Sequence, residues 1–126
     1  MTARGNHFVV DSPAPLGGPN EELNPIDLLL GALATCGTFV CEFAAQEMGI
    51  PLHSVAVTAA GDFDPRGLCG QGINPRMRAF RVRLALSGPT EEQAEELAEA
   101  FRTRCPVFTT FVRAAPIELE VEVTPG

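Results

Sequence analysis

The sequence predicts an α+β fold with a mostly antiparallel sheet, from two helical patterns and several alternating segments. An apolar stretch at 24–49 has helix start and stop signals, and a second, amphipathic helix is expected at 90–104. Segments 53–62, 77–86 and 117–123 alternate apolar and polar residues, as half-buried strands do. Strands and helices in this mixed order are typical of α+β proteins with antiparallel pairing.

The chain of 126 residues is expected to form one domain, 1–126. Its formal net charge of −7 argues against nucleic acid or an anionic membrane surface as a partner. The first residues contain no apolar run of signal-peptide length, so we expect a cytoplasmic, reducing location. Four cysteines in such a compartment are typical of free, catalytic or redox-active thiols rather than of a disulfide framework.

The segment 24–49 is predicted to be the core helix. Asn24 is a suitable N-cap, Pro25 fits the first helical position, and Asp27 lies in the first turn, where the dipole favours a carboxylate. Cys36 lies on an apolar stripe of this helix, and the opposite side of the helix is also mostly apolar. We therefore expect the helix to be buried nearly all round. Its uncharged run of 14 residues is too short to span a bilayer.

Local signals also place an early strand and the second helix. The β-prone residues 7–11 predict a strand close to the start of the chain. Thr90 and Gln93 have the spacing of a capping box, which opens the helix expected at 90–104.

The alternating segments 77–86 and 117–123 are predicted to pair as neighbours. The first turns Arg81 and Arg83 away from its apolar side, and the second turns three glutamates away in the same manner. Paired strands would align these side chains in an Arg–Glu ladder, each pair contributing about 0.2–1 kcal/mol. We interpret this as a solvated charged face rather than as a substrate site.

Cys105 directly precedes Pro106. A proline restricts the preceding residue away from helical backbone angles and is itself suited to the first position of a helix. Cys105 is therefore predicted to be the N-cap of a short helix at 106–113.

The composition leaves thiol chemistry as the main catalytic possibility. All nine basic residues are arginine, which excludes a Schiff-base lysine. Only His7 and His53 could act as imidazole bases, and no G-x-S-x-G nucleophile motif accompanies them. The cysteines at 36, 41, 69 and 105 include no C-x-x-C pair, so we expect no structural zinc site, no other metal and no cofactor. Cys41 is expected to belong to the core, and Cys69 to an exposed glycine-rich loop.

Two cysteine-containing stretches resemble the signatures of the OsmC/Ohr family. The first consists of Asp11-Ser12-Pro13, Gly17-Gly18 and the run N-P-I-D-L-L-L-G-A-L-A-T-C that ends at Cys36. The second is Cys105-Pro106-Val107, some seventy residues further on. With G-I-P-L-H-S-V-A-V at 49–57, the resemblance covers nearly the whole chain.

The resemblance implies an OsmC-like fold and a peroxidase activity. In this fold, two chains form an intertwined homodimer with two central helices backed by sheets, and the active sites lie at the dimer interface. The implied reaction reduces organic hydroperoxides in oxidative stress defence. Cys36 attacks the peroxide, Cys105 resolves the sulfenic acid as a disulfide, and an external dithiol of the lipoyl type reduces that disulfide.

The sequence departs from the family at two supporting positions. The family has a glutamate after the proline of the helix start, which polarises the reactive cysteine together with a distant arginine. Ile26 stands in the place of that glutamate, and Asp27 lies about 100° further round the helix. Arg4 is the only arginine before the core helix. Asp27 and Arg4 are therefore the supporting candidates for the site.

Electrostatics from the sequence alone favour the second cysteine. Cys36 lies about 18 Å from the start of its own helix, beyond the reach of the dipole, and an apolar setting raises a thiol pKa. Cys105, as a helix N-cap, lies where a thiolate is favoured. Two alternatives to the enzyme therefore stay open. One is a non-catalytic OsmC-like dimer that binds a small molecule or is a stress-related protein, and the other is a thiol redox sensor.

Overall fold

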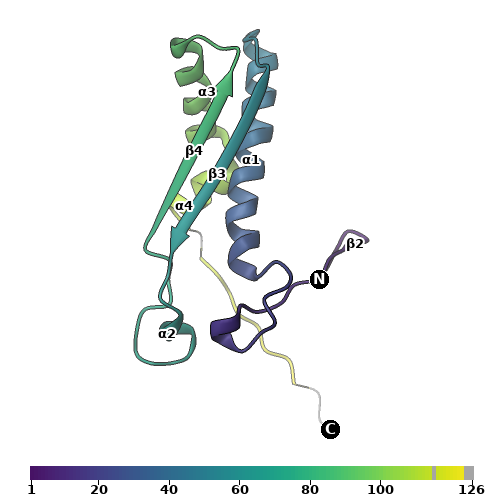
Figure 1. Cartoon of the computed structure of the whole chain (residues 1–126), viewed down its shortest axis with the longest axis vertical. Helices are drawn as coiled ribbons and strands as arrows, with labels where there is room; N and C mark the ends of the chain where they lie inside the picture. The colour runs from purple at the N-terminus through teal and green to yellow at the C-terminus, as the bar shows by residue number, and fades with distance from the viewer. Residues whose placement is uncertain (115, 124–126) are drawn as a thin grey trace.

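A computed structural model describes residues 1–114 and 116–123 (Figure 1). A hairpin of two long strands lies across the longest helix and a second, shorter helix that runs beside it. The elements in chain order are β1 (Thr2–Ala3), β2 (Asn6–His7), η1 (Ala14–Leu16), α1 (Pro25–Met48), β3 (Ser54–Asp62), α2 (Pro65–Leu68), β4 (Ala79–Ser87), α3 (Glu91–Arg104) and α4 (Pro106–Val112).

Helix α1 begins and ends where the sequence predicts. The N–H of Asp27 donates to Oδ1 of Asn24 at 2.9 Å, and the N–H of Asn24 donates to Oδ2 of Asp27 at 3.1 Å. This capping box satisfies backbone donors that have no partner inside the helix. Gly49 ends the helix in the left-handed conformation, with φ of 70°, which a glycine adopts without strain.

Strands β3 and β4 lie close to where their alternation predicts, and they form an antiparallel pair with each other that was not predicted from the sequence. The register runs from Ser54 opposite Ser87 to Asp62 opposite Ala79. Along both strands half-buried residues alternate with exposed ones, so one face of the pair packs on the helices and the other faces solvent.

Helix α3 packs against α1 at a point of close approach. The Thr90 and Gln93 capping box opens α3, as predicted, and Cys105 ends it. A β-carbon placed on Gly37 of α1 would lie 2.6 Å from Cζ of Phe101 of α3, so only glycine fits there. The core around this contact consists of Leu33, Cys41, Ala44, Ala45, Ile50, Leu97, Ala100, Phe101 and Cys105.

The strand predicted at 7–11 is largely wrong. Only His7 of this range lies in a strand, in a short hairpin whose turn residues Arg4 and Gly5 have φ of 52° and 81°. Val10 makes a single bridge to Leu23. Asp11 accepts two backbone hydrogen bonds from the loop before α1, at 2.9 and 3.0 Å, so this segment folds onto a loop instead of a sheet.

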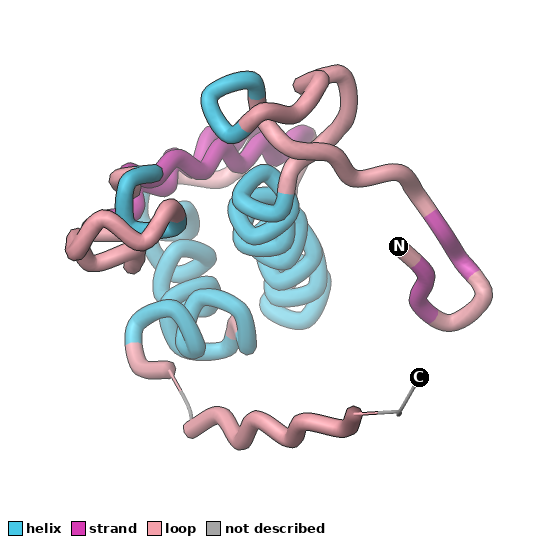
Figure 2. Tube along the Cα trace, turned by 90° about the horizontal axis from the view of Figure 1, so that it is seen from below, coloured by secondary structure: helices cyan, strands magenta, loops and turns pink. Residues whose placement is uncertain are grey.

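The strand predicted at 117–123, and with it the Arg–Glu ladder, is also wrong. This segment is extended but belongs to no sheet, and Ile117 and Leu119 are 91% and 87% exposed. The helices lie between it and the β3–β4 pair (Figure 2), so it has no strand neighbour. Arg81 instead lies 3.4 Å from Asp62 of β3.

Helix α1 is not buried all round, contrary to the sequence prediction. One side faces β3 and α3, while Phe39 and Phe43 on the other side are 68% and 61% exposed and Leu29 is 39% exposed. By length and composition α1 could also cross a membrane, a property that it shares with core helices of soluble proteins. The apolar surface of α1 therefore extends beyond the part that the rest of this chain covers.

Candidate thiol site

The thiols of Cys36 and Cys105 are neighbours, and Cys105 lies close enough to Cys36 to raise the pKa of its thiol. The two residues are 69 positions apart in the sequence. Cys36 is half-buried in the middle of α1, whereas Cys105 is fully buried at the junction of α3 and α4. All four cysteines of the chain are free thiols. The fold therefore brings together the two cysteines that sequence analysis selected.

The start of α4 supplies hydrogen-bond donors to both sulfur atoms. The N–H of Phe108 donates to Sγ of Cys105 at 3.3 Å, which confirms Cys105 as the N-cap of α4. The N–H of Val107 donates to the sulfur of Cys36. These first N–H groups of a helix have no partner within it, so they remain available to an anion.

Burial nevertheless raises the pKa of the Cys36 thiol above its usual value, and the neighbouring Cys105 adds to this effect. The hydrogen bond from Val107 lowers the pKa of Cys36, but it is a smaller effect than burial. The prediction for the pKa of Cys36 included only the dipole of its own helix, α1, and not hydrogen-bond donors from α4. The Cys105-Pro106 helix start contained that signal.

The other two cysteines are placed as expected. Cys41 is fully buried in the core, and burial, followed by the nearby Cys105, raises its pKa. Cys69 is exposed, directly after α2 in the loop at the far end of the β3–β4 hairpin. Among residues 1–114 and 116–123, no group of three His, Cys, Asp or Glu side chains is arranged to hold a metal ion.

The two supporting candidates do not reach Cys36 within the chain that the structure describes. Asp27 is engaged in the capping box of α1 and lies nine residues, about 13 Å, from Cys36 along the helix. Ile26 and Asp27 line a separate cavity of about 670 Å³ at the start of α1. Arg4 lies in the turn of the β1–β2 hairpin and makes no hydrogen bond or ion pair within the described residues. Neither charge affects the pKa of Cys36 in this chain.

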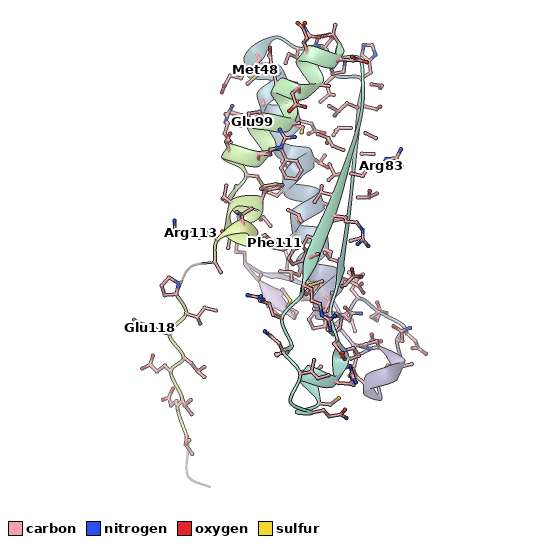
Figure 3. The ribbon with its side chains drawn as sticks, turned by 90° about the vertical axis from the view of Figure 1, so that its left-hand side faces the viewer. Met48, Arg83, Glu99, Phe111, Arg113 and Glu118 are labelled. Carbon is pink, nitrogen blue, oxygen red and sulfur yellow. The ribbon has the colours of Figure 1, made fainter. Side chains whose placement is uncertain are left out.

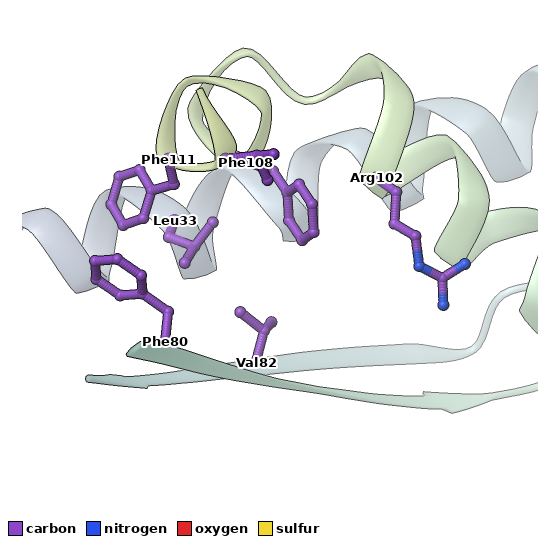
Figure 4. A pocket seen from close by; sticks show the side chains of 7 residues that line it. Leu33, Phe80, Val82, Arg102, Phe108 and Phe111 are labelled. Atoms are coloured by element: carbon purple, nitrogen blue, oxygen red, sulfur yellow. The ribbon is translucent and has the colours of Figure 1, made fainter. Parts of the chain in front are cut away.

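An apolar cavity of about 460 Å³ has Leu33 of α1 and Phe108 of α4 among its walls (Figure 4). Phe108, whose N–H donates to Sγ of Cys105, is one of its walls, and its ring packs edge-on against that of Phe101 with centroids 5.1 Å apart. The cavity is lined by Leu33, Phe80, Val82, Arg102, Phe108, Phe111 and Val112. A molecule in this cavity would contact Phe108, the residue whose N–H donates to Cys105.

Solved structures with a similar fold include bacterial proteins of 17–27% identity to this chain. An OsmC-like protein of Mycoplasma pneumoniae has a TM-score of 0.67 and 18% identity, over 82% of this chain and 70% of its own. An organic hydroperoxide resistance protein OsmC of Legionella pneumophila has a TM-score of 0.62 and 22% identity, over 82% and 72%. An organic hydroperoxide resistance protein of Elizabethkingia anophelis has a TM-score of 0.61 and 24% identity, over 82% and 70%.

No curated protein matches the chain. The family model described as OsmC-like protein matches residues 18–120, a range that contains both cysteines of the thiol pair. The match spans most of the chain, and the structural neighbours share its α+β architecture. The chain therefore belongs to the OsmC-like protein family.

Proposed function

We propose that this protein is a thiol-dependent peroxidase that reduces organic hydroperoxides, with Cys36 as the attacking thiol and Cys105 as the resolving thiol. The observation that carries this proposal is the contact between the two thiols at the start of α4. Two relatives by fold, from L. pneumophila and E. anophelis, are named organic hydroperoxide resistance proteins, which supports the same substrate class.

The proposed reaction balances with one peroxide and one external dithiol. The thiolate of Cys36 attacks the terminal oxygen of the hydroperoxide, the O–O bond breaks, and the leaving alkoxide takes a proton to become the alcohol. Cys36 is then a sulfenic acid, and the sulfur of Cys105 attacks it, forming a disulfide and releasing water. A lipoyl-type dithiol reduces this disulfide by two exchange steps and becomes oxidised itself.

The thiol contact suits this sequence of steps for a physical reason. A sulfenic acid that persists is open to further, irreversible oxidation, and an adjacent thiol removes it first. Because Cys105 lies beside Cys36 in this chain, the resolving step would need no large rearrangement of the backbone. The apolar cavity beside Phe108 would accept the alkyl or aryl part of the peroxide.

We further propose that the active form is a homodimer in the cytoplasm. The exposed apolar side of α1, formed by Leu29, Phe39 and Phe43, is suited to a second copy of this chain. The exposed apolar residues of 117–123 would be covered in the same assembly. Since the pKa of Cys36 is raised within one chain, we assign its activation to an arginine of the second copy, with Arg4 as the candidate.

The test is consumption of cumene hydroperoxide with dihydrolipoamide as reductant. The parent, Cys36→Ser, Cys105→Ser and Cys69→Ser are compared, the last being the matched control because Cys69 is exposed and lies outside the pair. We expect consumption by the parent and by Cys69→Ser, and none by Cys36→Ser. Loss in Cys105→Ser with retention in Cys36→Ser would invert the two roles. A parent without consumption would refute the enzyme.

One observation favours a second candidate function. Ile26 can neither hydrogen-bond nor carry charge in the place of the family's glutamate, and the pKa of Cys36 is raised. A non-catalytic OsmC-like dimer that binds a small molecule would fit these features. A redox sensor would form the Cys36–Cys105 disulfide with one equivalent of peroxide but would not turn over. Mass spectrometry of the oxidised protein distinguishes it from the binding dimer, and the absence of continued peroxide consumption distinguishes it from the peroxidase.

A further inference from the structure

Helix α4 is a weak helix by its own sequence. Its seven residues, P-V-F-T-T-F-V, include no alanine, leucine or other strong helix former, and β-branched and aromatic residues have lower helix propensities. An isolated helix shorter than about 12 residues is marginal in water. No residue of α4 is buried within the part of the chain that the structure describes. The helix therefore depends on its N-cap and on its contacts with the rest of the fold.

Two aromatic contacts hold α4 against the core. The ring of Phe111 lies against that of Phe80 on β4, with centroids 4.7 Å apart, and the ring of Phe108 packs against Phe101 of α3. Both phenylalanines of α4 point into the cavity that they line (Figure 4). These contacts act on one side of the helix only, so they restrain α4 without enclosing it.

The chain after α4 adds no anchor within residues 1–114 and 116–123. Val112, the last residue of α4, is 75% exposed. Beyond Arg113 the segment that carries Glu118 is extended, lies away from the sheet (Figure 3) and joins no strand. A loss of the N-cap would therefore not be offset at the other end of the helix.

The N-cap of α4 is itself one of the two redox thiols. Sγ of Cys105 accepts the hydrogen bond of the Phe108 N–H at 3.3 Å, and the sulfur of Cys36 accepts that of the Val107 N–H. A disulfide would bring the two sulfur atoms to about 2 Å from each other at a defined dihedral angle, and it would leave neither of them with a thiolate charge. The cap and the disulfide thus make competing demands on the Cys105 side chain.

We propose that α4 is a redox-sensitive cover of the thiol pair: when Cys36 and Cys105 form a disulfide, the sulfur of Cys105 leaves the Phe108 N–H and α4 loosens. In the reduced protein Cys105 is fully buried, so a bulky external dithiol has no access to it. Loosening of α4 uncovers the disulfide for its reductant, and reduction restores the cap. The inference rests on the proposed pairing of Cys36 with Cys105 and adds a step between formation of the disulfide and its reduction.

The test is hydrogen exchange, measured by mass spectrometry before and after oxidation with diamide. Diamide takes two electrons and two protons from a pair of thiols and joins them as a disulfide. The protein carries Cys69→Ser, which removes the exposed thiol. We expect the amides of 107–112 to exchange about fivefold faster or more after oxidation, while those of α3 keep their rates. Cys36→Ser in the same background is the matched control, and diamide should leave its α4 exchange unchanged.

The cap is tested without oxidation by two variants at one position. Cys105→Ala removes the capping atom and should speed up α4 exchange as oxidation does, whereas Cys105→Ser supplies an oxygen acceptor and should keep α4 protected. Equal α4 exchange in these two variants would overturn the switch.

Three results of the oxidation experiment would also overturn the switch. They are unchanged α4 exchange, equal acceleration in α3, and failure of diamide to join Cys36 to Cys105. Because diamide forms the disulfide without peroxide, a protein whose α4 loosens on oxidation but that consumes no peroxide would refute the peroxidase and leave the switch in place.

Discussion

The two sides of α1 are equally apolar in sequence but differ in what covers them. On the covered side Leu33 and Cys41 are 2% and 0% exposed, beneath β3–β4 and α3. On the open side Phe39 and Phe43 are more than half exposed, with Arg104 lying 5.8 Å above the ring of Phe43. Cys36 lies between the two sides and is half-buried. The apolar pattern of a helix thus predicts how much of its surface is buried in the assembled protein. It does not predict whether that surface is buried by the same chain or by another one.

The largest expected effect comes from charging the open side. In Phe39→Glu/Phe43→Glu, we expect the dimer Kd to rise by about 100-fold or more. Burying each phenylalanine at an interface contributes about 1.5–3 kcal/mol, and a buried carboxylate adds a further cost. Analytical ultracentrifugation measures the change. Thr103→Glu, on the exposed surface of α3, should leave the dimer intact. A parent protein that is monomeric at all concentrations would contradict the dimer.

The close packing on the covered side of α1 is tested by adding one methyl group at Gly37. Gly37→Ala should lower the free energy of unfolding by about 1–3 kcal/mol, because the new β-carbon would displace the ring of Phe101. Gly31→Ala is the matched control on the same helix, since a β-carbon there meets nothing within 4 Å. It should stabilise by up to about 1 kcal/mol, the difference in helix propensity. Urea unfolding of both variants measures this, and equal stabilities would refute the close packing.

The pKa of Cys36 depends on burial within this chain and, in the proposed dimer, on an arginine of the second copy, so it tests both sides of α1. Burial raises this pKa above its usual value, so alkylation of Cys36 by iodoacetamide should keep speeding up, by about tenfold per pH unit, from pH 7 to 9 wherever the second copy is absent. The dissociated variant Phe39→Glu/Phe43→Glu provides that state. If an arginine of the second copy lowers the pKa, the dimeric parent should level off at lower pH, and Arg4→Ala should behave like the dissociated variant. Identical profiles in all three proteins would exclude that role for Arg4.

The smallest effect is expected at the rim between the two sides. Arg104 pairs with Glu47 at 3.2 Å, and both side chains are largely exposed. An exposed ion pair contributes only about 0–1 kcal/mol because water and salt screen it. Glu47→Gln should therefore change the urea midpoint slightly, and less at high salt than at low salt. A loss larger than that of Gly37→Ala would mean that the rim and not the close helix contact holds α1 to α3.

Helices α1, α3 and α4 and the positions of strands β3 and β4 could be predicted because their signals are local. Caps at Asn24, Thr90 and Cys105 fixed three helix starts, and strict alternation fixed the two paired strands. The segment 117–123 alternates just as well but is not a strand, since pairing needs a neighbour that this pattern does not specify. The burial of α1 was overestimated for the same reason.

The thiol site was predictable in its members and less so in its electrostatics. Nothing in the spacing of Cys36 and Cys105 indicates that they touch, and only the resemblance to OsmC/Ohr proteins paired them. The hydrogen bond from Val107 to Cys36 comes from a helix that is remote in sequence, so reasoning along one helix could not include it. Contacts of this kind, between segments that are remote in sequence, cannot be predicted from local sequence patterns.

The absence of a side chain at Gly37 has a consequence for the neighbouring residue. Cys36 directly precedes this glycine on α1, and Cys105 lies one helical turn after Phe101, the ring that fills the space over it. Because Gly37 carries only a hydrogen atom in place of a side chain, α1 and α3 can pack closely, and this close packing determines how near the sulfur atoms of Cys36 and Cys105 can come. A larger residue at that position would leave both cysteines in the sequence and still pull the pair apart.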